Sequence, residues 1–274
     1  IPGDPARLVA GPQATLEDVE VVREELGLNK PIVTQYVDYV TGLFHGDLGM
    51  SLRTKRPVAT EVSLRYMNTV KLTLGSLAWS VVVGVLLGVW SGKHRSKWQD
   101  YTGMTMAISG ISMPSFWIGF LLIMVFSVNL KWLPTTGADS WKSFILPSIA
   151  LGTSIAAIIA RSSIIEVMKE DYIRTARAKG LKERTVIWKH AFRNAMISVV
   201  TVVGLQFGFL LGGSVVTESV FAFPGLGSLL VESVNYRDYN AIQSLILIFS
   251  LHFVVINLVV DILYALLNPE IKLN

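Results

Sequence analysis

The chain has 274 residues, of which 51% are hydrophobic and only 16% charged, and its mean hydropathy is +0.51. These values indicate a membrane protein rather than a soluble domain. The net charge of +4 comes from Lys and Arg in short segments between apolar stretches, which argues for retention at the cytoplasmic face and against nucleic-acid binding. Cysteine is absent, so disulfides, thiolate metal sites and a cysteine nucleophile are excluded.

The pattern of residues 1–68 predicts a small helical segment outside the membrane. Thr15 followed by Asp18 is an acidic variant of the capping box, and it opens an apolar series that ends at Gly27. A second amphipathic stretch, 32–44, begins beside Pro31. We expect a structural lid over the outer ends of the spans, with a role in substrate specificity as the less favoured alternative.

Five stretches satisfy the need of a bilayer core about 30 Å thick for about 20 mainly apolar helical residues. They are 69–90, 104–128, 144–165, 196–217 and 242–267. Pro114 and Pro147 lie in or beside these spans, and glycines recur at helical spacing, which favours close helix packing over a hinge. The sequence therefore predicts an all-α polytopic membrane protein with a transmembrane domain at 69–274.

The loops 93–97 and 166–195 are rich in Lys and Arg, whereas 129–143 and 218–241 are poor in them. Because short basic loops stay on the cytoplasmic side, the first two are predicted to be cytoplasmic and the other two extracytoplasmic. Residues 1–68 then lie outside, and we expect a further membrane-crossing helix before Ile1.

Polar residues inside the predicted spans usually face a protein interior. Those that could line a translocation path are Gln206, Ser214, Gln243 and Asn257. A helix interface is the favoured alternative for the same residues. Arg161 and Asp261 lie near span ends, where snorkelling or ion pairing explains them.

No motif for catalysis, cofactor binding or metal binding is found. The sequence has no phosphate-binding Gly-x-x-x-x-Gly-Lys-Ser/Thr loop, its four histidines are scattered, and no serine lies in Gly-x-Ser-x-Gly. We expect a chain that is not an enzyme and carries no cofactor or metal.

The basic loop 166–195 alternates charged and apolar positions at helical spacing, with Ile173, Ala176 and Gly180 on one side. Gly180 can end a first helix in the left-handed conformation, and residues 182–190 can form a second. The small residues Ala176 and Ala178 would allow close approach of a partner, and the arginines could pair with its carboxylates. On physical grounds, a hairpin that docks on a partner and a hairpin without one fit equally well.

Several segments resemble the permeases of ABC importers, in the branch that carries dipeptides, oligopeptides and nickel. The segments are 171–180 (DYIRTARAKG), 189–195 (KHAFRNA), 1–5 (IPGDP), 56–58 (RPV), 221–227 (FAFPGLG), 237–239 (RDY) and 257–261 (NLVVD). Residues 137–141 and 204–213 are especially similar to glutathione-importer permeases. In the wider family the loop reads Glu-Ala-Ala and then Gly after three residues; here Arg174, Thr175 and Ala176 stand there, with Gly180 kept.

The resemblance implies a type I importer permease in the bacterial inner membrane, forming half of a channel for peptides, glutathione or a metal chelate. It also implies a second permease subunit, two P-loop ATPases that hold ATP and Mg²⁺, and an extracytoplasmic binding protein. The residues expected to dock on an ATPase are Tyr172, Arg174, Thr175, Ala176, Arg177, Ala178, Lys179, Gly180 and Leu181. Two alternatives from other classes stay open: an ion-coupled transporter, for which only Asp261 is an available carboxylate, and a membrane-embedded enzyme.

Overall fold

A computed structural model describes residues 4–11, 13–152 and 155–267, and it is built from helices. Within these ranges the β pairing consists of one isolated bridge between Met50 and Pro57. The all-α prediction is therefore confirmed. The chain divides into two compact units, one formed by 1–69 and 224–250 and the other by 70–223 and 251–274. The long helices α4 (Val58–Lys93) and α13 (Tyr239–Leu267) contribute residues to both units.

The amino-terminal part of the first unit contains α1 (Pro5–Ala10), α2 (Leu16–Glu25) and α3 (Ile32–Phe44). The predicted capping box is present, because the Thr15 hydroxyl accepts from the Asp18 amide while the Asp18 carboxylate accepts from the Thr15 amide. The second amphipathic stretch forms α3 at the predicted residues. The helix α1 was not predicted. Its first turn is capped by Asp4, whose carboxylate also binds Arg23 of α2 at 2.5 Å.

The remainder of the first unit contains α12 (Leu226–Asn235) and the first turns of α4 and α13. Buried apolar side chains join these three helices: Val58, Val62, Leu226, Leu229, Ala241 and Leu245. The helix α12 lies within 218–241, which the sequence analysis treated as a plain loop. The region has one basic residue, Arg237, besides the acidic residues Glu218, Glu232 and Asp238.

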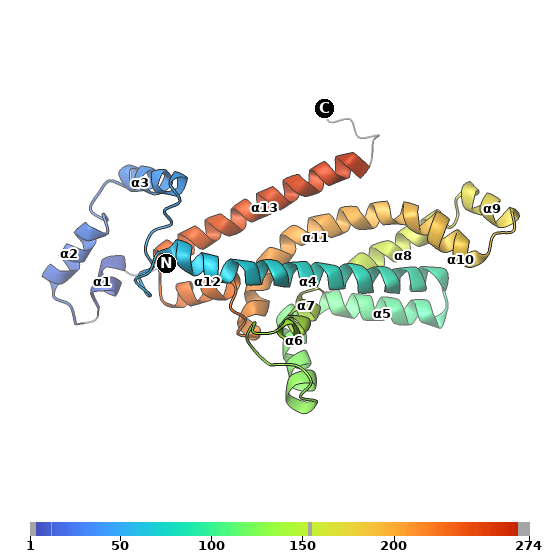
Figure 1. Ribbon diagram of the computed structural model, residues 1–274, viewed down its shortest axis with the longest axis horizontal. Helices are drawn as coiled ribbons and strands as arrows, with labels where there is room; N and C mark the ends of the chain where they lie inside the picture. Colours follow the sequence, from blue (N-terminus) through green and yellow to red (C-terminus); the bar gives the residue numbers. More distant parts are fainter. Residues whose placement is uncertain (1–3, 12, 153–154, 268–274) are drawn as a thin grey trace. The chain divides into compact units, whose positions relative to one another are not determined.

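The second unit holds most of the long helices. Besides parts of α4 and α13 it contains α5 (Trp98–Ser112), α6 (Ser115–Leu122), η1 (Ile123–Asn129), η2 (Trp141–Phe144), α7 (Ile145–Leu151), α8 (Ile155–Val167), α9 (Asp171–Ala178), α10 (Glu183–Thr185), η3 (Val186–Ala191) and α11 (Phe192–Val220). Here α4, α5, α8 and α11 run beside one another, and α9 and α10 lie at one end of this bundle (Figure 1).

Among the described residues, two helices are long and apolar enough to cross a membrane: α4, and α13 from Tyr239 to Val260. Two bent pairs bring the number to four if each pair makes one span: Trp98–Ser112 with Ser115–Asn129, and Trp141–Leu151 with Ala156–Val167. The remaining predicted span, 196–217, lies inside the continuous helix α11, which does not meet the same test over the described residues.

The predicted span 104–128 is therefore two helices, bent by 108°. The cause is Pro114, because proline disfavours the helical conformation at the preceding residue: Met113 is extended, with ψ of 134°. Pro114 in turn starts α6.

Glycines allow close helix packing at two of the predicted positions. A Cβ added to Gly88 of α4 would lie 2.6 Å from the Ala157 carbonyl oxygen of α8, and one added to Gly204 of α11 would lie 2.7 Å from a Val260 methyl of α13. Both distances are too short for real carbon contacts. The predicted role in helix packing is thereby confirmed at Gly88 and Gly204.

Candidate functional site

The loop between α8 and α11 forms a compact projection, which we call the knob (residues 171–191). It consists of α9, a turn at Gly180, α10 and the π-helical segment η3, which continues directly into α11. Gly180 has φ of +76°. Its amide donates to the Arg177 carbonyl and the Leu181 amide donates to the Ala176 carbonyl, which is the Schellman arrangement that ends a helix. The predicted role of Gly180 as helix stop is confirmed.

The base of the knob is apolar. Ile173 and Val186 are fully buried, and Ile187 is 3% exposed. They belong to one core cluster with Ile164 at the end of α8, so the knob is fixed to the bundle by side-chain packing.

Ala176 is part of the same cluster and only 6% exposed. Its side chain therefore packs against the rest of the knob, and docking of Ala176 on an ATPase stays a prediction. The other eight residues predicted to dock on an ATPase are exposed: Tyr172, Arg174, Thr175, Arg177, Ala178, Lys179, Gly180 and Leu181.

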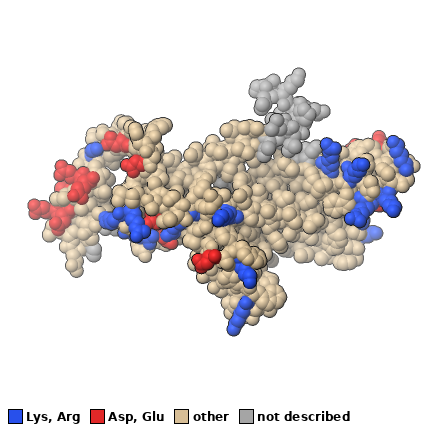
Figure 2. Space-filling view, in the orientation of Figure 1, with Lys and Arg blue, Asp and Glu red and all other residues tan. Residues whose placement is uncertain are grey.

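Lys and Arg side chains gather over the end of the second unit formed by α9 and α10 (Figure 2). Two of these arginines have carboxylate partners inside the knob. Arg174 binds Asp171 at 3.2 Å, and Arg177 forms a two-pronged contact with Glu183, with nitrogen–oxygen distances of 2.8 and 3.2 Å. The second pair joins the two helical arms across the Gly180 turn. The prediction that the arginines pair with carboxylates of a partner did not take account of Glu183, which lies six residues after Arg177.

The Arg177 guanidinium holds the pKa of Glu183 below its usual range, mainly through these hydrogen bonds, and the carboxylate raises the pKa of Arg177. Partial burial opposes both shifts. Since both side chains are about half exposed, the pair orients the arms and adds little stability.

Two polar contacts connect the helices around the knob. The Asn194 amide of α11 donates to the Tyr172 hydroxyl of α9 at 2.6 Å. Deeper in the bundle, the Arg161 guanidinium of α8 donates two hydrogen bonds to the Asp100 carboxylate of α5, with nitrogen–oxygen distances of 2.5 and 2.7 Å. Asp100 also accepts a hydrogen bond from the Ser96 amide at 3.0 Å. The expected pairing of Arg161 is confirmed. The contact connects the first basic loop to α8, the helix that leads into the knob.

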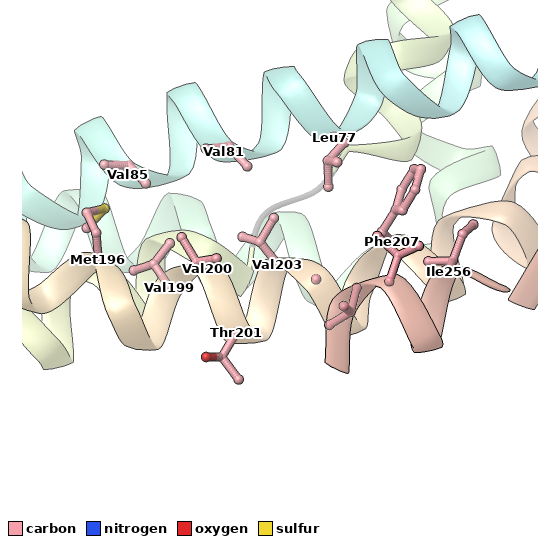
Figure 3. Close-up of a pocket in the computed structure, with 13 residues that line it drawn as sticks. Leu77, Val81, Val85, Met196, Val199, Val200, Thr201, Val203, Phe207 and Ile256 are labelled. Carbon is pink, nitrogen blue, oxygen red and sulfur yellow. The ribbon is translucent and has the colours of Figure 1, made fainter. Parts of the chain in front are cut away.

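The residues suggested for a translocation path differ in burial. Ser214 is fully buried, Gln206 and Asn257 are half-buried, and Gln243 is exposed. The side chain of Asp261 lies outside the described residues. A cavity of about 530 Å³ between α4, α11 and α13 is lined almost entirely by carbon, with Leu77, Val81 and Val85 opposite Val199 and Val203 (Figure 3). Gln206, Ser214 and Asn257 are not among its lining residues.

The first unit carries a buried polar centre that the sequence analysis did not single out, which we call the Asp238 clamp. Asp238 is 2% exposed and accepts hydrogen bonds from the Ser51 hydroxyl and from the amides of Leu52, Arg53 and Ala241. The clamp joins two segments about 185 positions apart. Two of the segments that resemble importer permeases meet at the clamp. Residues 56–58 pair with residues 49–51 next to it, and the segment 237–239 contains Asp238 itself.

Solved structures show which fold the chain shares. The fold resembles a chain of the inward-facing MetNI methionine ABC transporter, with a TM-score of 0.66 over 76% of this chain and 96% of that chain, at 15% identity. It also resembles a chain of an amino acid ABC transporter solved with histidines, with a TM-score of 0.53 over 82% and 97%, at 16% identity. The fold is that of ABC importer permeases.

Residues 84–273 match the family described as binding-protein-dependent transport system inner membrane component, and residues 1–73 match the corresponding N-terminal family. The chain belongs to this family and is a multi-pass membrane permease. It is 55% identical to the glutathione transport system permease protein GsiC of Escherichia coli O6:H1, over 99% of this chain and 90% of that protein. GsiC proteins of Escherichia coli K12 and Shigella dysenteriae are 54% identical over the same shares.

Proposed function

We propose that this chain is one of two permease subunits of an ATP-driven importer in a bacterial inner membrane, and that its cargo is glutathione or a closely related short peptide. The observation that carries the proposal is 55% identity to a glutathione permease along almost the whole chain. The compared region covers the spans as well as the knob, so the identity supports a common cargo class and not only a common fold.

In this proposal an extracytoplasmic binding protein delivers the cargo, a second permease completes the channel, and two ATPase subunits hold ATP and Mg²⁺. The chain itself needs no cofactor. Gln206, Ser214, Gln243 and Asn257 remain the residues proposed to face the path, which the assembled pair of permeases would complete.

The knob is the proposed docking site for one ATPase. Its shape supports this role, because an apolar base fixes it to α8 and α11 while its tip exposes Ala178, Lys179 and Leu181. When the ATPases close on ATP, a knob attached in this way would move with the helices on either side of it and not bend separately.

The cargo is tested by uptake into vesicles that contain the four-subunit complex and ATP, with the binding protein outside. We expect uptake of labelled glutathione that needs both ATP and the binding protein. Uptake of a nickel chelate or an unrelated dipeptide at the same rate would contradict the glutathione assignment, and uptake driven by an ion gradient without ATP would contradict the importer.

Docking is tested by Ala178→Trp, which adds bulk at the exposed tip without touching the apolar base. We expect the complex to lose ATPase subunits, or to keep them without stimulation of hydrolysis by the binding protein. Ala59→Trp is the matched control, an exposed alanine in the first turn of α4, in the other unit. Equal ATPase content and stimulation in both variants would contradict docking through the knob.

A further inference from the structure

A second cavity, of about 600 Å³, lies between α9, η3 and the start of α11. Cationic and polar groups line one part of it: Lys189, His190 and Arg193, with Tyr172 and Asn194 beside them. Met196 and Val200 line the rest. The cavity therefore changes from cationic to apolar along its length.

This change follows the direction of α11. Arg193, Met196 and Val200 are three and seven residues apart, so they lie on one face of the helix, and Lys189 precedes them by one turn. The apolar end of the cavity coincides with the first turns of the predicted span 196–217. The cationic end therefore lies at the expected level of the cytoplasmic membrane surface, where the basic loop ends and the span begins.

The two long cations of the cavity lack an internal counter-charge. In the ranges that the structure describes, neither Lys189 nor Arg193 has a carboxylate within salt-bridge distance, whereas Arg174 and Arg177 of the same knob do. The Tyr172 hydroxyl accepts the Asn194 amide hydrogen at 2.6 Å, which leaves its own proton to donate to a ligand.

We propose that this cavity binds the phosphate headgroup of an anionic glycerophospholipid, with the upper acyl chains against Met196 and Val200. A phosphate diester beside glycerol and hydrocarbon reproduces the order of cations, hydrogen-bond donor and apolar side chains along the cavity. A zwitterionic lipid would bring a further cation toward Lys189 and Arg193, so the preferred headgroup is phosphatidylglycerol or cardiolipin. The proposal needs the chain to lie in a membrane with this loop inside, but it does not depend on the cargo.

The test uses the purified four-subunit complex in nanodiscs of phosphatidylcholine with added phosphatidylglycerol, and native mass spectrometry measures the lipids retained. The double variant Lys189→Gln/Arg193→Gln is compared with Arg95→Gln/Lys97→Gln, which removes two cations from the other predicted cytoplasmic loop. Because each surface cation strengthens binding of an anionic lipid by about fivefold, we expect retention to weaken by roughly 30-fold in the first variant and little in the second. The swap Lys189→Arg/Arg193→Lys should restore retention.

Three results would overturn the proposal. Equal loss of lipid in both glutamine variants would mean that only the overall surface charge matters. Loss of ATPase subunits from Lys189→Gln/Arg193→Gln would mean that the cavity is a protein interface. Displacement of the retained phosphatidylglycerol by millimolar inorganic phosphate would mean that the site binds a soluble anion and not a lipid. Thermal unfolding of each variant beforehand verifies that the fold is intact.

Discussion

The knob and the Asp238 clamp hold their polar groups in opposite ways. In the clamp one buried carboxylate accepts four hydrogen bonds, and three of the donors are backbone amides. In the knob the charged pairs are exposed, and stability comes from Ile173, Val186 and Ile187 beneath them together with the backbone turn at Gly180.

The Asp238 clamp is thus a fixed structural joint, whereas the knob presents a surface that can accept a partner. Removing the buried carboxylate of the clamp leaves several donors without an acceptor, which is costly. The surface charges of the knob are solvated, so they can exchange their partners for those of another protein at little cost. Four substitutions test this contrast, from the largest expected effect to the smallest.

Asp238→Ala should destabilise the first unit by about 3–5 kcal/mol, because the Ser51 hydroxyl and three amides lose their acceptor inside the protein. The measurement is thermal unfolding of the solubilised complex, with hydrogen exchange of the Leu52 and Arg53 amides as a local report. The exposed Asp139→Ala is the control and should change little. If the two variants unfolded at the same temperature, the clamp would not be a structural joint.

Ile173→Ala should destabilise the knob by about 3 kcal/mol, since it leaves a cavity in the fully buried base of α9. Leu181→Ala, on the exposed side of the same knob, should cost less than about 0.5 kcal/mol. Protease sensitivity of residues 171–191 provides the measurement. Similar sensitivity in both variants would mean that the base does not hold the knob.

Gly180→Ala should cost about 1 kcal/mol, because the left-handed conformation at φ of +76° disfavours a Cβ although space for it is open. Gly180→Asn should cost less, since asparagine tolerates this conformation. The readout is ATPase stimulation by the binding protein together with unfolding of the knob. A greater loss with asparagine than with alanine would point to side-chain bulk instead of backbone conformation.

Arg177→Gln should have the smallest effect, a few tenths of a kcal/mol, because the Arg177–Glu183 pair is about half exposed. The pKa of folded Glu183 is lowered, so its contribution is present above the ordinary glutamate pKa and disappears as the pH falls through the folded value. Unfolding midpoints of the two proteins should thus differ at neutral pH and converge in acid. A difference in unfolding midpoint that grows in acid would contradict stabilisation by the ionised Glu183 carboxylate.

The sequence predicts structure best where the signal is local. The capping box at Thr15, the helix over 32–44 and the stop at Gly180 each depend on neighbouring residues, and each is confirmed. The break at Pro114 was also readable, because proline restricts the residue before it. The apolar run on both sides of Pro114 nevertheless predicts one span over 104–128, and the glycine spacing favours packing over bending.

Features that depend on distant residues could not be predicted. Nothing near Asp238 indicates that its acceptor sites are filled by residues 51–53. The inward position of Ala176 depends on Val186 and Ile187 folding back beneath α9 after the glycine turn. The spacing placed Ile173 and Ala176 on one face, but it could not tell whether that face lies against the bundle or against a partner.

The absence of cysteine allows a direct test of the central proposal that the tip of the knob contacts an ATPase. A thiol-reactive photocrosslinker is attached to Ala178→Cys in the assembled, transport-competent complex, and Ala59→Cys is the control in the first unit. Docking predicts a light-dependent covalent adduct between this chain and an ATPase subunit for position 178 and none for position 59. A complex that hydrolyses ATP and transports cargo, yet gives no ATPase adduct from position 178, would contradict it.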